Sequence, residues 1–254
     1  MTKPAVADCW TLIDGRHLYA RRLGRWPASA NPPLVMVHGL GVSGRSMLPA
    51  ARLLAADRPV LIPDLPGFGR SQGPWRALDI PALAAALAAW LATLGLERAD
   101  WLGNSLGCQV CLALAAAWPE RARRLVLVGP TIDPAARSVA RQLARLLRDW
   151  PRERLSLTPI HAWDDLRAGP RRILATLRHA LADPVEDRLP LVAQPALVVR
   201  GDRDPVAPQA WAERMAAALP AGRLAVLPGA PHAANYSAPR ALAAAVGPFL
   251  AEAA

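Results

Sequence analysis

The segment Gly103–Gly107 (GNSLG) has the residue types and the spacing to present a serine nucleophile on a sharp turn. A short apolar run ends at Leu102, and a run of helix-forming residues, Cys108–Trp118, follows the turn. A serine placed between a strand and a helix stands at the tip of a sheet, where the backbone N–H of the next residue points toward the group under attack. The same pattern also fits a serine that caps a helix after a tight turn. Nucleophilic catalysis by Ser105 is therefore a hypothesis that the rest of the chain must support.

A serine hydroxyl becomes an effective nucleophile only when a neighbouring base accepts its proton, and histidine does this near neutral pH. His232 lies in a loop of glycine, proline and alanine just past the last expected strand, where packing gives no reason for an imidazole. We therefore expect His232 to be the base. The other histidines are expected at loop, turn, surface or helix positions without that role: His17, His38, His161 and His179.

The chain has 254 residues, which is long enough for one sizeable core and fits one α/β domain with an insertion. Apolar residues make up 53% of the chain, which excludes disorder. The net charge is +10, but Lys3 is the only lysine and the arginines are scattered among alanines and prolines. Nucleic-acid binding would need basic residues clustered on one face together with stacking aromatics, and the sequence has no such motif. We expect no nucleic-acid partner.

Three cysteines, Cys9, Cys108 and Cys111, give no disulfide framework, which favours a reducing compartment. Cys108 and Cys111 have C-x-x-C spacing, but they fall within the helix expected after the serine turn and have no further ligands nearby in the sequence. We predict two small core residues rather than a metal or redox site.

The first ten residues contain no apolar signal region. The most apolar run, Ile80–Leu96, is short, dominated by weakly apolar alanine and set between two loop motifs. It is typical of a buried helix rather than a membrane span. The sequence predicts a soluble, cytoplasmic protein without a membrane partner, and it leaves the oligomeric state open.

Apolar runs of strand length alternate with helical segments, the pattern of a parallel sheet covered on both faces. An edge hairpin is expected near the start, because Asp14-Gly15 is a strong turn signal between two strand-like segments. The expected strands are Trp10–Ile13, Arg16–Leu23, Pro33–Val37, Pro59–Ile62, the run that ends at Leu102, Arg124–Val128, Ala196–Arg200 and Leu224–Leu227.

The alternation breaks after Pro130, and from there to about Pro190 the sequence is helical and rich in arginine. One apolar stripe in this segment has helical spacing: Val139, Leu143, Leu146, Leu147 and Trp150. We expect the segment to be an insertion that packs over the carboxyl ends of the strands.

Four motifs stand in one order, each at the end of an expected strand. They are HGLG at 38–41, DLPGFGRS at 64–71, GNSLG at 103–107, and GDRD at 201–204 followed by GAPH at 229–232. This arrangement resembles the α/β-hydrolase superfamily, and the likeness covers nearly the whole chain outside the insertion. The resemblance implies an α/β fold of the α/β-hydrolase type, with a mostly parallel central sheet flanked by helices. It also implies a core at residues 1–130 and 191–254, and a helical cap at 131–190 inserted after the sixth strand.

The family's chain order Ser, Asp, His implies a catalytic triad of Ser105, Asp204 and His232. A tetrahedral intermediate needs two backbone N–H donors. Leu106 supplies one of them from the serine turn, and the resemblance assigns the other to Leu40.

The identity of the acid is a choice between neighbouring aspartates. The family spacing Gly-x-x-Asp-x-x-x-Pro matches Gly201, Asp204 and Pro208, which favours Asp204, while Asp202 is expected to bond within its own turn. Asp133, beyond the preceding strand, stays open as an alternative because some relatives carry the acid there.

The expected reaction is hydrolysis of a small carboxylic ester through an acyl-enzyme, with a small-molecule substrate and no cofactor or metal. The sequence Gly103-Asn104-Ser105 also resembles that of bacterial hydrolases that cleave carbon–carbon bonds in aromatic ring-fission products, in which an asparagine often precedes the serine. The resemblance makes Asn104 a possible substrate-binding residue. Those enzymes tend to carry a tryptophan after the histidine, where this chain has Ala233. A non-catalytic receptor or scaffold on the same fold is a third hypothesis, disfavoured because all three triad residues are present.

Overall fold

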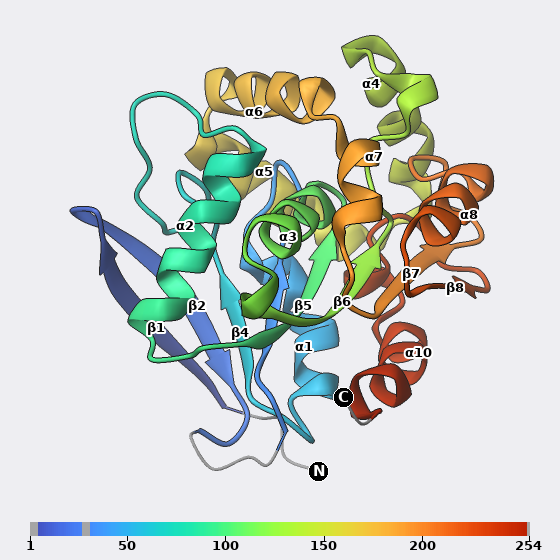
Figure 1. Cartoon of the computed structure of the whole chain (residues 1–254). Helices are drawn as coiled ribbons and strands as arrows, with labels where there is room; N and C mark the ends of the chain where they lie inside the picture. The colour runs from blue at the N-terminus through green and yellow to red at the C-terminus, as the bar shows by residue number, and fades with distance from the viewer. Residues whose placement is uncertain (1–4, 27–30, 253–254) are drawn as a thin grey trace.

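The computed structural model describes residues 5–26 and 31–252, and it contains an eight-stranded sheet with helices on both faces (Figure 1). Residues 1–4, 27–30 and 253–254 lie outside the described residues. All of them belong to the predicted core, and residues 1–4 also belong to the segment expected to lack a signal region. The strands are β1 (Val6–Ile13), β2 (Arg16–Leu23), β3 (Leu34–Val37), β4 (Val60–Pro63), β5 (Ala99–Asn104), β6 (Ala122–Val128), β7 (Ala196–Gly201) and β8 (Gly222–Leu227).

The strands lie in the order β1-β2-β4-β3-β5-β6-β7-β8. β2 pairs antiparallel with both β1 and β4, and the remaining neighbours are parallel. The hairpin between β1 and β2 turns at Asp14 and Gly15, which have φ angles of 48° and 73°, as a two-residue hairpin turn requires. The predicted edge hairpin and mostly parallel sheet are confirmed.

The helices are α1 (Leu48–Leu54), α2 (Ile80–Thr93), α3 (Leu106–Ala117), α4 (Val139–Asp149), α5 (Thr158–Ala168), α6 (Pro170–Ala182), α7 (Val185–Arg188), α8 (Gln209–Ala218), α9 (Ala234–Ser237) and α10 (Pro239–Ala251). The side chain of Asp79 accepts the backbone N–H of Ala82 and so caps the first turn of α2.

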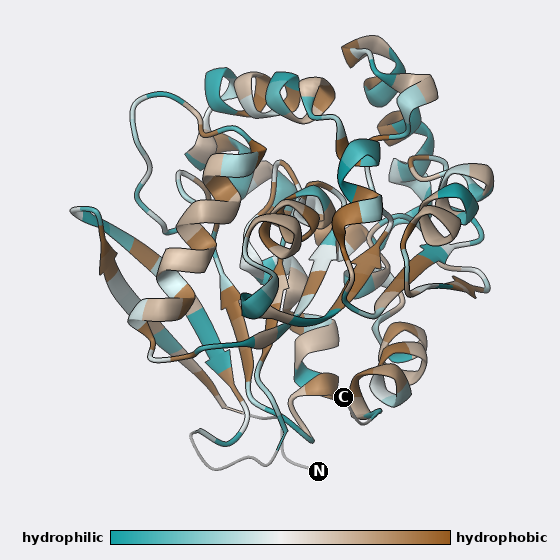
Figure 2. Cartoon of the chain, in the orientation of Figure 1, coloured by the Kyte–Doolittle hydropathy of each residue, from teal (hydrophilic) through white to brown (hydrophobic). Residues whose placement is uncertain are grey.

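Two apolar cores lie on the two faces of the sheet. Helices α2, α3 and α8 pack on one face, and α1 and α10 pack on the other. Every residue of β3, β4, β5 and β7 is buried, as expected for strands covered on both faces. β3 and β4 are accordingly apolar throughout. Figure 2 shows hydrophobic residues along β4 and β6, and alternating hydrophobic and hydrophilic turns along α6.

Between β6 and β7 the chain forms helices and turns only, and Figure 1 shows α4 and α6 beyond the arrowheads of the strands. The segment also contributes to the core, because Ile132, Ala180, Val185 and Leu189 are buried in the same apolar cluster as α3.

Candidate active site

Ser105 lies between β5 and α3 with φ 55° and ψ −119°, a conformation that costs a non-glycine residue about 1–3 kcal/mol. Its backbone N–H donates to the carbonyl of Val128 on the neighbouring strand at 2.9 Å. The flanking glycines let the turn close: a Cβ on Gly107 would lie 2.3 Å from the carbonyl oxygen of Val37, and one on Gly103 would lie 2.4 Å from the backbone of Gly107. The surrounding backbone therefore holds the serine in its strained position.

A histidine and a carboxylate meet beyond the ends of β7 and β8. Nδ1 of His232 lies 2.9 Å from Oδ2 of Asp204, and both side chains are buried. The other oxygen of Asp204 accepts the backbone N–H groups of Val206 at 2.7 Å and Ala207 at 3.0 Å. Because both its oxygens are engaged, the carboxylate has one orientation, and it fixes the ring of His232.

The two alternative acids have other partners. Oδ1 of Asp202, an exposed residue, accepts the backbone N–H of Gly229 at 2.7 Å, outside its own turn. Asp133 pairs with Arg145 at 2.9 Å and with Arg214 at 3.1 Å. Neither carboxylate is bonded to the ring of the histidine.

Nε2 of the histidine ring is buried and makes no hydrogen bond within the described part of the chain. His232 and Ser105 line the same cavity. A buried nitrogen without a hydrogen-bond partner costs free energy. Nε2 is therefore expected to form a hydrogen bond when a ligand occupies the cavity.

The loop after β3 lies directly over the serine. A Cβ on Gly39 would lie 3.3 Å from Cβ of Ser105, and the next residue, Leu40, lines the cavity. His38 holds this loop, because its ring contacts the carbonyl of Gly39 at 2.7 Å and accepts the backbone N–H of Leu65 at 2.9 Å. Burial lowers the pKa of His38, in keeping with a neutral structural residue.

Leu106 is the first residue of α3, and the first backbone N–H groups of a helix have no partner inside it. These groups carry partial positive charge and face the end of the sheet where the serine stands. Leu40 and Leu106 thus both border the cavity beside the serine.

Asn104 lines the cavity but is buried, and its amide nitrogen donates to the carbonyls of Val128 at 3.1 Å and His232 at 3.3 Å. The side chain therefore ties the serine turn to the loop that carries the histidine.

Two carboxylates that the sequence analysis missed hold the histidine loop from the insertion side. Oδ1 of Asp149 accepts the backbone N–H of His232 at 3.2 Å, and Oε1 of Glu153 accepts that of Ala233 at 2.6 Å. Oε2 of Glu153 also contacts the hydroxyl of Ser237. No motif marks these residues, since they act on backbone groups and their partners lie about eighty positions away in the chain.

These charges shift the titration of the site. Burial lowers the pKa of His232, but the carboxylates of Asp204, Asp149 and Glu153 outweigh burial and raise the pKa to about 9. Burial raises the pKa of Asp149 against the opposing effect of His232, and Glu153 raises it further, to about 7. The three carboxylates therefore favour the imidazolium.

The cavity has a volume of about 310 Å³ and a mostly apolar wall. Its apolar side chains come from the serine turn, the insertion and the loops after β3 and β7: Leu40, Val42, Leu106, Ile132, Leu143, Leu146, Trp150, Leu155, Leu157, Ile173, Leu177 and Val206. Its charged residues are three acids and one arginine: Asp149, Glu153, Asp165 and Arg154. Burial, together with Asp164, raises the pKa of Asp165 to about 6.

Cys108 and Cys111 are fully buried in α3, and burial raises the pKa of both thiols. Within residues 5–26 and 31–252, no three His, Cys, Asp or Glu side chains are grouped as a metal site would need. In the same ranges no helix has the length and apolarity needed to cross a membrane.

A model of the Alpha/beta hydrolase family matches residues 34–245. The chain belongs to the alpha/beta hydrolase family. The match begins at the first residue of β3 and includes the serine turn, the two aspartates after β7 and the histidine loop.

Similarity to known members extends over most of this hydrolase. It is 29% identical over 244 residues to the biotin biosynthesis bifunctional protein BioHC of Cellvibrio japonicus, which covers 86% of this chain and 47% of that protein. It is 39% identical over 107 residues to the 2-hydroxy-6-oxo-2,4-heptadienoate hydrolase of Pseudomonas putida, covering 39% and 38% of the two chains. The chain thus spans less than half of the length of these two relatives. The crystal structure of a hydrolase from Pseudomonas aeruginosa superposes with a TM-score of 0.78 and 28% identity, covering 97% of this chain and 98% of that one.

Proposed function

We propose that this hydrolase cleaves small, uncharged carboxylic esters through an acyl-enzyme on Ser105. The observation that carries the proposal is the state of His232. One ring nitrogen is held by a buried carboxylate at 2.9 Å, while the other is buried and unbonded within the described residues, and His232 lines the same cavity as Ser105. A histidine held in this way can accept a serine proton and return it to a leaving group.

In the first half-reaction the hydroxyl oxygen of Ser105 attacks the ester carbonyl carbon while Nε2 of His232 accepts the hydroxyl proton. Asp204 keeps the other ring proton on Nδ1 and balances the positive charge that develops on the ring. The carbonyl oxygen becomes an oxyanion that accepts the backbone N–H groups of Leu40 and Leu106. When the tetrahedral intermediate collapses, Nε2 gives its proton to the departing alcohol, and the acyl group stays on the serine.

In the second half-reaction a water molecule takes the place of the alcohol. Nε2 of His232 removes its proton as the water oxygen attacks the acyl carbon, and the same two backbone donors hold the new oxyanion. Collapse returns the proton to Ser105 and releases the carboxylic acid.

The charges of the cavity select the substrate class. When His232 is neutral, as the attack of Ser105 requires, the charged lining comprises Asp149, Glu153, Asp165 and Arg154, so acids outnumber bases there. Most of the apolar side chains in the wall are leucine, isoleucine and valine. A carboxylate on the acyl group would be desolvated beside these acids and would meet repulsion from them. A neutral acyl chain instead covers apolar side chains, and a volume of about 310 Å³ limits its size.

Cleavage of a carbon–carbon bond is the second candidate. It is supported by Asn104 and by the 39% identity to the 2-hydroxy-6-oxo-2,4-heptadienoate hydrolase. A dienoate substrate carries a carboxylate, however, and the amide nitrogen of Asn104 is already bonded to two backbone carbonyls. The ester hypothesis therefore fits the cavity better.

A matched pair of chromogenic esters tests the proposal. p-Nitrophenyl butyrate and p-nitrophenyl hemisuccinate have acyl chains of equal length, but the second ends in a carboxylate. We expect turnover of the butyrate with kcat/KM about tenfold or more above that of the hemisuccinate, because one buried like-charge contact costs at least about 1.4 kcal/mol. Turnover of a ring-fission product, followed by loss of its colour, without turnover of either ester would favour carbon–carbon cleavage. No turnover of any of them would favour the non-catalytic hypothesis.

A further inference from the structure

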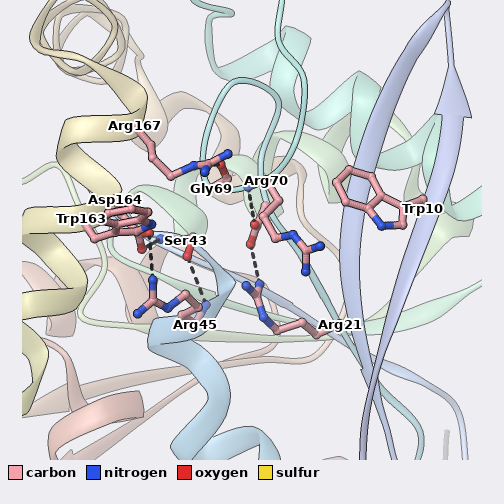
Figure 3. A pocket seen from close by; sticks show the side chains of 10 residues that line it. Trp10, Arg21, Ser43, Arg45, Gly69, Arg70, Trp163, Asp164 and Arg167 are labelled. Atoms are coloured by element: carbon pink, nitrogen blue, oxygen red, sulfur yellow. Dashed lines mark hydrogen bonds and ion pairs between the residues drawn. The ribbon is translucent and has the colours of Figure 1, made fainter.

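A second cavity lies where β1, β2 and two core loops meet the insertion helix α5 (Figure 3). Its volume is about 300 Å³, and it shares no lining residue with the cavity that holds Ser105. Its wall is unlike the catalytic one, because it contains four arginines and two tryptophans.

The two aspartates in this wall, Asp64 and Asp164, already accept hydrogen bonds from groups of the protein. Asp64 accepts a buried arginine, Arg21, at 2.8 Å and two backbone N–H groups, also at 2.8 Å. Oδ2 of Asp164 accepts the backbone N–H of Ser43 at 2.8 Å. A third carboxylate, Asp8, lies beside the wall and pairs with Arg70 at 2.5 Å. With four guanidinium groups against three carboxylates, the recess keeps an excess of one positive charge.

Two of the four arginines have unused donors. The guanidinium of Arg45 lies 3.8 Å from Asp164, beyond hydrogen-bond distance, and its side chain is 40% exposed. Arg167 is exposed and uses Nε for the carbonyl of Gly69 at 3.0 Å. Within the described part of the chain, no further side-chain hydrogen bond engages either guanidinium. Free guanidinium N–H groups have the fork geometry that carboxylates and phosphates accept.

Figure 3 shows Trp10 and Trp163 on opposite sides of the recess with the arginines between them. The two indoles are 47% and 53% exposed. Trp10 is held in place from one side, since its ring centroid lies 4.9 Å from that of Tyr19 and the guanidinium of Arg70 lies 5.1 Å from it. Exposed indole faces beside a cationic recess are suited to a planar ring.

We propose that this recess binds a small aromatic anion, a planar ring that bears a carboxylate or a phosphate monoester. Arg45 and Arg167 hold the oxyanion, and Trp163 contacts the ring. The carboxylate and phosphate forms share this chemistry, and the experiment below distinguishes them.

A ligand in this position joins two parts of the fold. Arg45 belongs to the short helical turn after the loop that carries Leu40, whereas Arg167 belongs to α5 of the insertion. An anion bound between them adds a bridge beside the existing Ser43–Asp164 bond, and binding to the native state alone raises the melting temperature. The proposal does not depend on the reaction at Ser105, because it concerns a separate cavity.

Isothermal titration with benzoate, phenyl phosphate and neutral benzamide tests the proposal on the intact protein. We expect one site for benzoate or phenyl phosphate, with the tighter probe identifying the oxyanion, and binding of benzamide at least about tenfold weaker. The double variant Arg45→Gln/Arg167→Gln should weaken the tighter probe at least about tenfold, and Trp163→Ala should weaken it less. Both arginines are at the surface, so the variants should keep the wild-type circular dichroism spectrum.

Arg154→Gln is the matched control, since it removes one positive charge from the catalytic cavity instead. It should leave the affinity unchanged. The proposal is overturned if neither anion binds up to about 10 mM, if benzamide binds as tightly, or if Arg154→Gln weakens binding while the double variant does not.

Discussion

Replacing Asp204 with asparagine should abolish most of the activity by changing the tautomer of His232 rather than the fold. One oxygen of Asp204 accepts two backbone N–H groups at 2.7 and 3.0 Å, and the other lies 2.9 Å from Nδ1 of His232. Both sides need an acceptor. An asparagine amide offers one acceptor and one donor, so it cannot serve both sides.

We expect the asparagine oxygen to keep the two backbone N–H groups of Val206 and Ala207 rather than to face His232. If the amide oxygen stays on the two N–H groups, the amide nitrogen faces Nδ1 of His232, and the ring proton must move to Nε2, which then cannot accept the proton of Ser105. Turning the amide round leaves two buried donors unsatisfied, at about 1–3 kcal/mol each. The sum of about 2–6 kcal/mol corresponds to an excess of the inactive tautomer of about 30-fold to 10⁴-fold. Loss of the charge that stabilises the imidazolium adds to this, and we expect kcat/KM to fall by about four orders of magnitude.

Initial rates with p-nitrophenyl butyrate measure the effect, and circular dichroism checks that the variant is folded. Asp202→Asn is the matched control, because Asp202 is exposed and bonds to a single backbone N–H. It should lower kcat/KM by less than about tenfold. The reasoning is refuted if Asp204→Asn retains activity within about tenfold of the wild type, or if Asp133→Asn is the inactive variant.

Three further predictions follow from charge and packing. Because only neutral His232 accepts a proton, kcat/KM should rise with pH through a pKa above 6.5. Asp149→Asn removes a negative charge and should lower this pKa by about one unit. An unchanged pKa would contradict the role of Asp149 in raising the pKa of His232. Gly107→Ala should lower the melting temperature by about 3–10 °C, since the new Cβ would lie 2.3 Å from a carbonyl oxygen of β3. Gly247→Ala is the control and should leave the melting temperature unchanged, because no atom lies within 4 Å of its Cβ position. Equal effects of the two variants would contradict the steric reasoning. Asp100→Ala should cost about 3–5 kcal/mol in urea denaturation, because it leaves Arg58 and Arg123, which contact this buried carboxylate at 2.9 and 2.7 Å, without a carboxylate partner. A cost below about 1 kcal/mol would show that other groups compensate for both guanidinium charges.

The sequence predicted the sheet well because its signals are local. Continuous apolar runs of four to eight residues specify buried strands, and Asp14-Gly15 specifies the hairpin. The serine turn was predictable for the same reason: Gly103 and Gly107 are required by backbone contacts that close within a few residues or against the adjacent strand.

The orientation of α4 was not predictable in this way. The stripe that includes Leu143 and Leu147 has helical spacing and does form a helix, but these leucines are 49% and 73% exposed, while Gln142 and Asp149 of the same helix are buried. Polar side chains face inward because they bond to the backbone, Gln142 to the carbonyl of Ala136 and Asp149 to the histidine loop. Apolar periodicity identifies a helix, but it does not reveal polar contacts made with distant backbone.

Labelling with a fluorophosphonate, followed by mass spectrometry of the modified peptide, tests the central claim most directly. The reagent phosphonylates a serine only when a base activates it, so the label reports nucleophile and base together. We predict one modified peptide with the label on Ser105, no label on Ser105→Ala, and labelling at least about a hundredfold slower for His232→Ala. Rapid labelling of Ser105→Ala, or of His232→Ala at the wild-type rate, would contradict the account.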